Sequence, residues 1–172
     1  MACGNESQQN EAAQADSSVM APEQSVDMGA TLDAGENVDE PSCSASAAGE
    51  ICVLVQVPDT IPAQPEKVSI HFFTSVPPVG PPAILGAEIA EASELARFQA
   101  GETIPVSFGG LPASGSMFLY GVLYMPGGGA QTWQTAPGVD FHGAYSWDTP
   151  IEFTGEAINL EAPLTFSVYE EQ

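Results

Sequence analysis

Residues 117–124 read MFLYGVLY, and this run decides the fold. It is rich in aromatic and aliphatic side chains that favour strands, and it is strand-sized rather than helix-sized. Apolar side chains occupy both sets of alternating positions, which indicates a strand that is buried on both faces. The glycine-rich segment 126–129 ends the run. We therefore predict that residues 117–124 form the central, most buried strand of the domain.

Shorter runs with strand character lie on both sides of this central run. Those before it are 51–57, 68–72 and 103–108, and those after it are 139–145, 151–153, 157–160 and 164–169. Clusters of glycine and proline separate them at the spacing of roughly 8–12 residues that is typical of β-sandwiches. We therefore predict an all-β fold, an antiparallel Greek-key β-sandwich of about seven or eight strands, over residues 49–172.

Three places in this domain carry finer predictions. Residues 84–98 are rich in helix formers but lack a clean apolar stripe with a period of about 3.6 residues, so a helix, a short strand and a single turn all stay open. Pro105 indicates an edge strand or an outward position, because proline cannot donate to a sheet ladder. His71 alternates with Ile70 and Phe72, which predicts that it lies on the solvent face of its strand.

The charge of the chain excludes several classes of partner. It carries 23 acidic residues and only two basic ones, Lys67 and Arg97, for a net charge of −21. Phosphate backbones are bound by Lys and Arg, so we predict no binding to nucleic acid. Electrostatic docking on anionic lipid headgroups is disfavoured for the same reason. Solubility, a cationic partner and a divalent metal all remain compatible with the negative charge.

Residues 4–48 differ in texture from the rest of the chain. They hold nine carboxylates, no Lys or Arg and no aromatic residue. Such a segment buries too little apolar surface to offset the entropy of ordering it. We therefore predict that residues 1–48 form a disordered acidic tether, which its own charge repulsion extends.

The N-terminus reads Met1-Ala2-Cys3-Gly4 and continues into polar sequence. It resembles the processing site of a bacterial lipoprotein, although the apolar positions that precede the cysteine in that family are absent here. The resemblance implies that Cys3 is lipidated and anchors the protein in the membrane of the cell envelope, at the outer membrane or cell surface. Two alternatives stay open: an unmodified cysteine in a floppy N-terminus, and a cytosolic acidic protein that starts at Met1.

Cys43 and Cys52 are the only other cysteines, and they bracket the junction between tether and domain. In an exported protein such a pair favours a disulfide, which would hold the end of the tether against the first strand. Free thiols are the alternative. Zinc is disfavoured, because the sequence has no CxxC pair and only two histidines. We predict no metal site and no cofactor.

The segments 68–82, 104–115 and 118–124 follow one rhythm: a strand, a proline-rich loop, a polar strand, a turn of small residues, and an apolar strand ending in tyrosine. This rhythm resembles the transthyretin-like (carboxypeptidase-regulatory-like) β-sandwich domains of exported bacterial proteins. The resemblance implies a non-catalytic module. It does not extend to the triple-glycine loop 127–129 or to the aromatic segment that follows.

Residues 131–148 contain both tryptophans and are the strongest candidate for a binding surface. The candidate ligand-binding residues are Trp133, Asp140, His142, Tyr145, Trp147 and Asp148. One interpretation is a sugar or peptide surface with tryptophan platforms. A second is a cation held by Asp140, His142 and Asp148. A third is that the aromatic side chains only cover one end of the sandwich.

No sequence pattern indicates catalysis, since nucleophile, Walker and HExxH signatures are all missing, and we assign no catalytic residue. We expect a monomeric, non-catalytic cell-envelope lipoprotein that acts as a binding or structural module, with a protein or a carbohydrate as partner. The competing hypothesis is a small carbohydrate-active or hydrolytic enzyme that uses residues 131–148. Convergence of Trp133, Trp147, Asp140 and His142 in one concave pocket would favour an enzyme or a ligand site.

Overall fold

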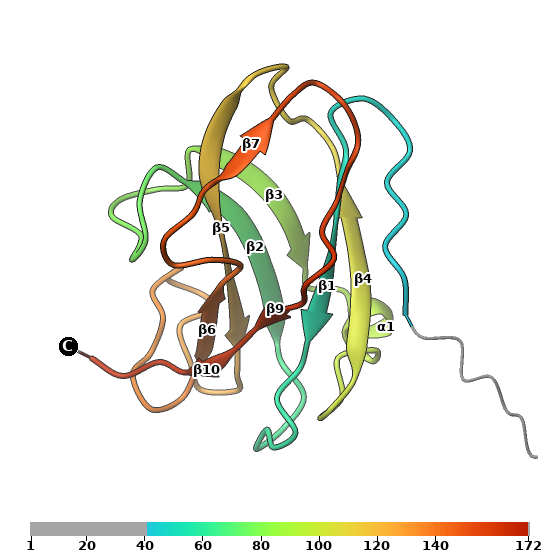
Figure 1. Cartoon of the computed structure of the whole chain (residues 1–172). Helices are drawn as coiled ribbons and strands as arrows, with labels where there is room; N and C mark the ends of the chain where they lie inside the picture. Colours follow the sequence, from blue (N-terminus) through green and yellow to red (C-terminus); the bar gives the residue numbers. More distant parts are fainter. Residues whose placement is uncertain (1–40, 172) are drawn as a thin grey trace, which may run out of the picture. The chain divides into compact units, whose positions relative to one another are not determined.

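A computed structural model describes residues 41–171 of the chain (Figure 1). Cys3 and most of the predicted tether, residues 1–40, lie outside the described residues. Within the described part, no helix is both long and apolar enough to cross a membrane.

Residues 41–171 form two packed sheets (Figure 1), which confirms the predicted all-β sandwich. The elements are β1 (Ile51–Gln56), β2 (Lys67–Phe73), β3 (Ile84–Ile89), α1 (Ala92–Leu95), β4 (Thr103–Phe108), β5 (Gly115–Tyr124), β6 (Phe141–Ala144), β7 (Ile151–Phe153), β8 (Ile158–Asn159), β9 (Leu164–Thr165) and β10 (Ser167–Val168). The four-stranded sheet has the order β4-β1-β8, with β9 also paired to β1. The six-stranded sheet has the order β10-β6-β5-β2-β3, with β7 also paired to β5.

Strand β5 is central to the six-stranded sheet, as its apolar sequence predicts. It pairs with β2 along one side and with β6 and β7 along the other. Leu119 and Leu123 enter the main core between the sheets, while Tyr120 and Val122 belong to a second apolar cluster on the opposite face. Both faces of β5 are therefore covered, and this is why its sequence does not alternate between apolar and polar residues.

Residues 84–98 contain both a short strand and a single helical turn, two of the three structures that the sequence allowed. Ile84–Ile89 is a strand that pairs with β2, and Ala92–Leu95 is a single helical turn. Leu95 is the buried residue of this helical turn. Pro105 lies in β4 at the end of the four-stranded sheet, so the predicted edge position is confirmed.

The C-terminal segment changes sheets, where the sequence predicts one alternating strand. Leu164 pairs with Val55 in the four-stranded sheet, and Ser167 pairs with His142 in the six-stranded sheet. The backbone therefore crosses between the layers at Phe166. This break, together with strand β3, explains why residues 41–171 contain ten strands rather than the seven or eight predicted.

The disulfide between Cys43 and Cys52 is present, as predicted, with the two Cα atoms 5.3 Å apart. Beside it, the backbone N–H of Ala45 donates to Oδ1 of Asn159 over 2.6 Å, and the Asn159 amide donates back to the Ala45 carbonyl over 3.1 Å. Contacts with the sandwich therefore begin a few residues before the predicted boundary at residue 49.

Candidate functional site

The outer face of the six-stranded sheet, turned away from the four-stranded sheet, carries both histidines of the chain and is covered by both tryptophans. Side chains that alternate along paired strands share one face. Register therefore places on it Lys67, Ser69, His71 and Phe73 of β2, Tyr120, Val122 and Tyr124 of β5, and His142 and Ala144 of β6. Glu88 of β3 joins them, because it pairs with Ser69.

Trp133 covers the β2 part of the outer face. The ammonium Nζ of Lys67 lies 3.2 Å from the centroid of its indole ring. The imidazole of His71 is stacked against the indole, with the centroids 6.1 Å apart and the planes inclined by 24°. The indole is nevertheless 51 % exposed. Trp133 is thus held from beneath by two side chains while a large part of its ring stays accessible.

Beneath Trp133, three polar side chains from two strands contact each other. Oε2 of Glu88 forms an ion pair with Nζ of Lys67 at 3.5 Å, and Oε1 of Glu88 lies 3.4 Å from Nε2 of His71. The N–H of Gly86 donates to Nδ1 of His71 over 3.0 Å, so the proton of the neutral ring sits on Nε2. Burial lowers the pKa of His71, and the smaller opposing effect of Glu88 does not reverse this.

The prediction that His71 is a surface residue is wrong, since the side chain is only 4 % exposed. Alternation did place it correctly on the face opposite Ile70. That face, however, is covered by the loop that carries Trp133. Ser69, which lies on the same face, is buried too. Its hydroxyl oxygen has no hydrogen-bond partner within residues 41–171, and Nε2 of His71 has only its 3.4 Å approach to Glu88.

Trp147 covers the β5–β6 part of the outer face. Its ring meets those of Tyr120 and His142 edge-on, with centroids 6.3 and 6.0 Å away, and it is 49 % exposed. Nδ1 of His142 and the hydroxyl of Tyr120 are hydrogen-bonded over 2.6 Å. Burial raises the pKa of Tyr120 and lowers the pKa of His142, so both side chains are neutral near neutral pH.

The two tryptophans share one surface. His71, under Trp133, and Tyr120, under Trp147, are direct cross-strand partners in the pairing of β2 with β5. Sequence reasoning found both tryptophans but missed Lys67, Ser69 and Glu88 beneath them. A signal existed for Lys67, which is one of only two basic residues in the chain and alternates with Ser69 and His71.

Asp140 does not lie on this surface, although the sequence grouped it with His142. Its side chain is fully buried, and its carboxylate accepts the backbone N–H groups of Met125, Gly129 and Ala136 over 2.8, 2.8 and 2.7 Å. It therefore organises the loop 125–140, which carries Trp133. Period-two alternation fails here because β6 begins only at Phe141.

The remaining candidates lie apart from each other. Tyr145 packs against the main core between the sheets, whereas Asp148 is exposed. Among residues 41–171 no group of three or more His, Cys, Asp or Glu side chains is arranged to hold a metal ion. The cation site suggested by Asp140, His142 and Asp148 is therefore not formed.

Comparison of the chain with protein-family models, with curated proteins and with solved structures found no match. The site therefore rests on its geometry alone.

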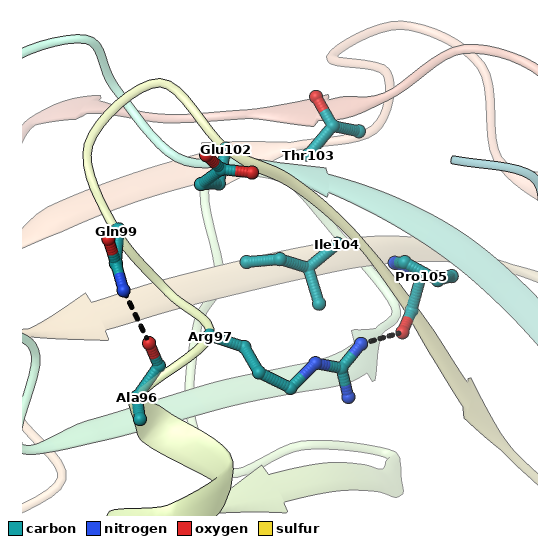
Figure 2. A pocket seen from close by; sticks show the side chains of 7 residues that line it. All are labelled: Ala96, Arg97, Gln99, Glu102, Thr103, Ile104 and Pro105. Atoms are coloured by element: carbon teal, nitrogen blue, oxygen red, sulfur yellow. Dashed lines mark hydrogen bonds between the residues drawn. The ribbon is translucent and has the colours of Figure 1, made fainter. Parts of the chain in front are cut away.

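A shallow depression of about 440 Å³ lies elsewhere, between α1 and β4, and contains neither tryptophan (Figure 2). Arg97 extends along it and donates to the carbonyl of Pro105 over 3.4 Å. Glu102 also lines the depression. The concave pocket that would have joined Trp133, Trp147, Asp140 and His142 is not formed, because Asp140 is enclosed by its own loop.

Proposed function

We propose that this protein is a non-catalytic lipoprotein of the bacterial cell envelope, whose β-sandwich binds a partner through the outer face of the six-stranded sheet. One observation carries the proposal: both tryptophans stand half-exposed on that face, and each is held by aromatic or cationic neighbours. Tryptophan supplies a large contact area for little loss of conformational entropy, and one already held in place loses still less.

The chemistry of the outer face supports binding rather than catalysis. The imidazole of His71 is engaged by the Gly86 N–H and faces Glu88, while that of His142 is engaged by the Tyr120 hydroxyl. A nucleophilic mechanism needs a histidine that faces a serine or cysteine. Neither histidine has such a neighbour among its hydrogen-bond partners in the described part of the chain.

Two features support the envelope as compartment. Disulfides persist in oxidising compartments, and the Cys43–Cys52 bridge fits an exported protein. The Cys3 motif and the acidic tether that follows it supply the means of attachment, with the domain held away from the membrane. We retain the resemblance to transthyretin-like modules as part of this proposal, together with a monomeric state.

Attachment is tested in a Gram-negative host that expresses the gene with its own upstream codons. We expect wild-type protein to incorporate labelled palmitate and to fractionate with membranes. Cys3→Ser should lose the label and move to the soluble fraction, while Cys43→Ser should keep the label. An unlabelled wild-type protein of unaltered mass would refute the anchor.

Binding is tested separately with the variants Trp133→Ala and Trp147→Ala, each compared with Leu85→Ala. Leu85 is a suitable control because it is 69 % exposed and lies on edge strand β3. We expect both tryptophan variants, and not the control, to lose retention on cell-envelope material. Equal retention of all three variants and wild type would refute binding through the outer face.

A further inference from the structure

We propose that Trp133 is a stacking platform for an uncharged saccharide ring, held in position by Lys67 and His71. The inference rests on the binding role proposed above and names its ligand class. It starts from the contacts of the indole. Lys67 lies 3.2 Å from the ring centroid and the His71 ring is nearly parallel to it, so one face of the indole is already occupied. The accessible part of the ring is left for a ligand.

The backbone conformation of Trp133 indicates that the surrounding structure holds the residue in place. Its φ of 62° is the only positive φ of a non-glycine residue within residues 41–171. Such a conformation persists only where neighbouring structure over-determines it, and it is common at functional sites. Here the neighbouring structure is the loop that Asp140 holds through three N–H groups.

The polar base beneath the indole is a second, independent observation. Ser69 and His71 are 3 % and 4 % exposed; the Ser69 hydroxyl has no hydrogen-bond partner in the described part of the chain, and Nε2 of His71 reaches only Glu88, at 3.4 Å. Buried polar atoms are nearly always paired, because leaving one unpaired lowers stability. A buried, unpaired hydroxyl and a weakly paired imidazole on the strand face beneath an exposed tryptophan indicate that stability is not the only requirement on the sequence here.

Charge selects among the possible ligands. The chain has a net charge of −21, and the Lys67 ammonium is matched by Glu88 at 3.5 Å. An anionic saccharide would therefore meet repulsion without a free cation to bind it. An uncharged pyranose can place its C–H face on the indole and its hydroxyls against exposed polar side chains such as those of Gln131 and Gln134, which flank Trp133 in the sequence.

The distribution of apolar surface favours a saccharide over a protein. A stable protein interface has a continuous apolar core. Within residues 41–171, the large exposed apolar side chains other than the two tryptophans are Val79, Leu85 and Val168, and they come from three different segments. Two aromatic platforms on one sheet face suit sugar rings spaced along an oligosaccharide.

The test uses the purified full chain and titrates it with cellohexaose, chitohexaose and hexagalacturonate, followed by tryptophan fluorescence and calorimetry. We expect at least one neutral hexasaccharide to bind, and hexagalacturonate to bind at least tenfold more weakly. Trp133→Ala should weaken binding at least tenfold, and Trp133→Phe should recover part of the loss. Leu85→Ala should bind as wild type does.

Lys67→Met separates the platform from simple exposure of a tryptophan. It keeps the packing of the side chain but removes the charge below the indole, so we expect binding to weaken several-fold while the circular dichroism spectrum stays unchanged. No binding of either neutral hexasaccharide, or equal binding by Trp133→Ala, overturns the inference. If Trp133→Ala instead abolishes retention on envelope proteins stripped of glycan, the saccharide is wrong although the binding role stands.

Discussion

Nδ1 of His142 lies 2.6 Å from the hydroxyl of Tyr120, diagonally across the β5–β6 pairing. The rings of Trp147 and Tyr169 pack edge-on against the same imidazole, at centroid distances of 6.0 and 5.1 Å. This makes the imidazole part of an apolar cluster in which a charge is poorly solvated. Burial accordingly lowers the pKa of His142, and it lowers that of His71 on the same sheet face as well.

We predict that these two histidines make the domain less stable as the pH falls below about 6.5, the ordinary pKa of histidine. In the unfolded chain both take up protons near that pH, whereas in the folded chain they do so only at lower pH. The unfolded state therefore binds more protons in this window, and the free energy of unfolding decreases with decreasing pH. Above pH 6.5 both histidines are neutral in the folded and in the unfolded state, so their contribution to the free energy of unfolding is constant. Urea unfolding between pH 8 and pH 5 measures this free energy.

The control for this prediction is the double variant His71→Gln/His142→Gln. Acidification also relieves repulsion among the 23 acidic residues, which acts in the opposite direction in both proteins. The difference between wild type and variant isolates the histidines. It should be flat above pH 7 and should fall between pH 6.5 and the lower pKa values of the folded state. A flat difference down to pH 5 would contradict the assignment.

Asp140→Ala should destabilise the domain by about 3–5 kcal/mol, because it leaves buried N–H groups without their charged acceptor. The affected donors are Met125, Gly129 and Ala136. Urea unfolding measures the loss, and amide exchange should rise throughout the loop 125–140. Asp148→Ala is the matched control: Asp148 is exposed, so we expect a change within about 0.5 kcal/mol. Similar values for the two variants would show that Asp140 does not organise the loop.

Local pattern was enough to predict the features that depend on neighbours in sequence. The apolar run around Tyr120 predicts the central strand, and the position of Cys43 and Cys52 predicts their bridge. Pro105 predicts the edge of a sheet, because this residue has no backbone N–H to donate to a neighbouring strand. The sequence also predicted that the two tryptophans mark the candidate surface, because aromatic residues in a polar segment can be recognised without knowledge of the fold.

Features that depend on a distant segment were not predictable in this way. His71 is buried by a loop some sixty residues later in the chain, and alternation gives only the face, not what covers it. Asp140 lies one residue before its strand begins, so period-two reasoning did not apply to it. The break at Phe166 is equally invisible, because Leu164 and Ser167 alternate normally and only their partners differ.

Removal of the disulfide should lower the free energy of unfolding by about 2–3 kcal/mol, the chain-entropy value for a loop of this length. The variant is Cys43→Ala/Cys52→Ala, compared with wild type by urea unfolding in the absence of reductant. Dithiothreitol should lower the stability of wild type toward that of the variant and leave the variant unchanged. Cys3→Ser should have no effect on stability in either condition. A variant as stable as oxidised wild type would show that the bridge does not restrict the unfolded chain.

Gly143→Ala tests the crossing of the C-terminal segment between the sheets. A Cβ at Gly143 would stand 1.9 Å from the carbonyl oxygen of Thr165, which is backbone and cannot rotate away. The segment from β9 to β10 must therefore shift, and we expect a loss of about 2–3 kcal/mol in urea unfolding. The loss should be accompanied by faster proteolysis of the C-terminal residues and by a changed near-ultraviolet signal, because Tyr169 then leaves the ring of His142.

The matched control is Gly109→Ala, at the end of β4. There the nearest atoms to a new Cβ are Cγ of Glu50 at 3.7 Å and the carbonyl oxygen of Gly49 at 3.9 Å, both ordinary contacts. The backbone at Gly109 is not in the left-handed region, so alanine is accepted without strain and stability should change by less than about 1 kcal/mol. Equal stability of the two variants would mean that Thr165 does not pass over Gly143, and the C-terminal segment would then not join the two sheets.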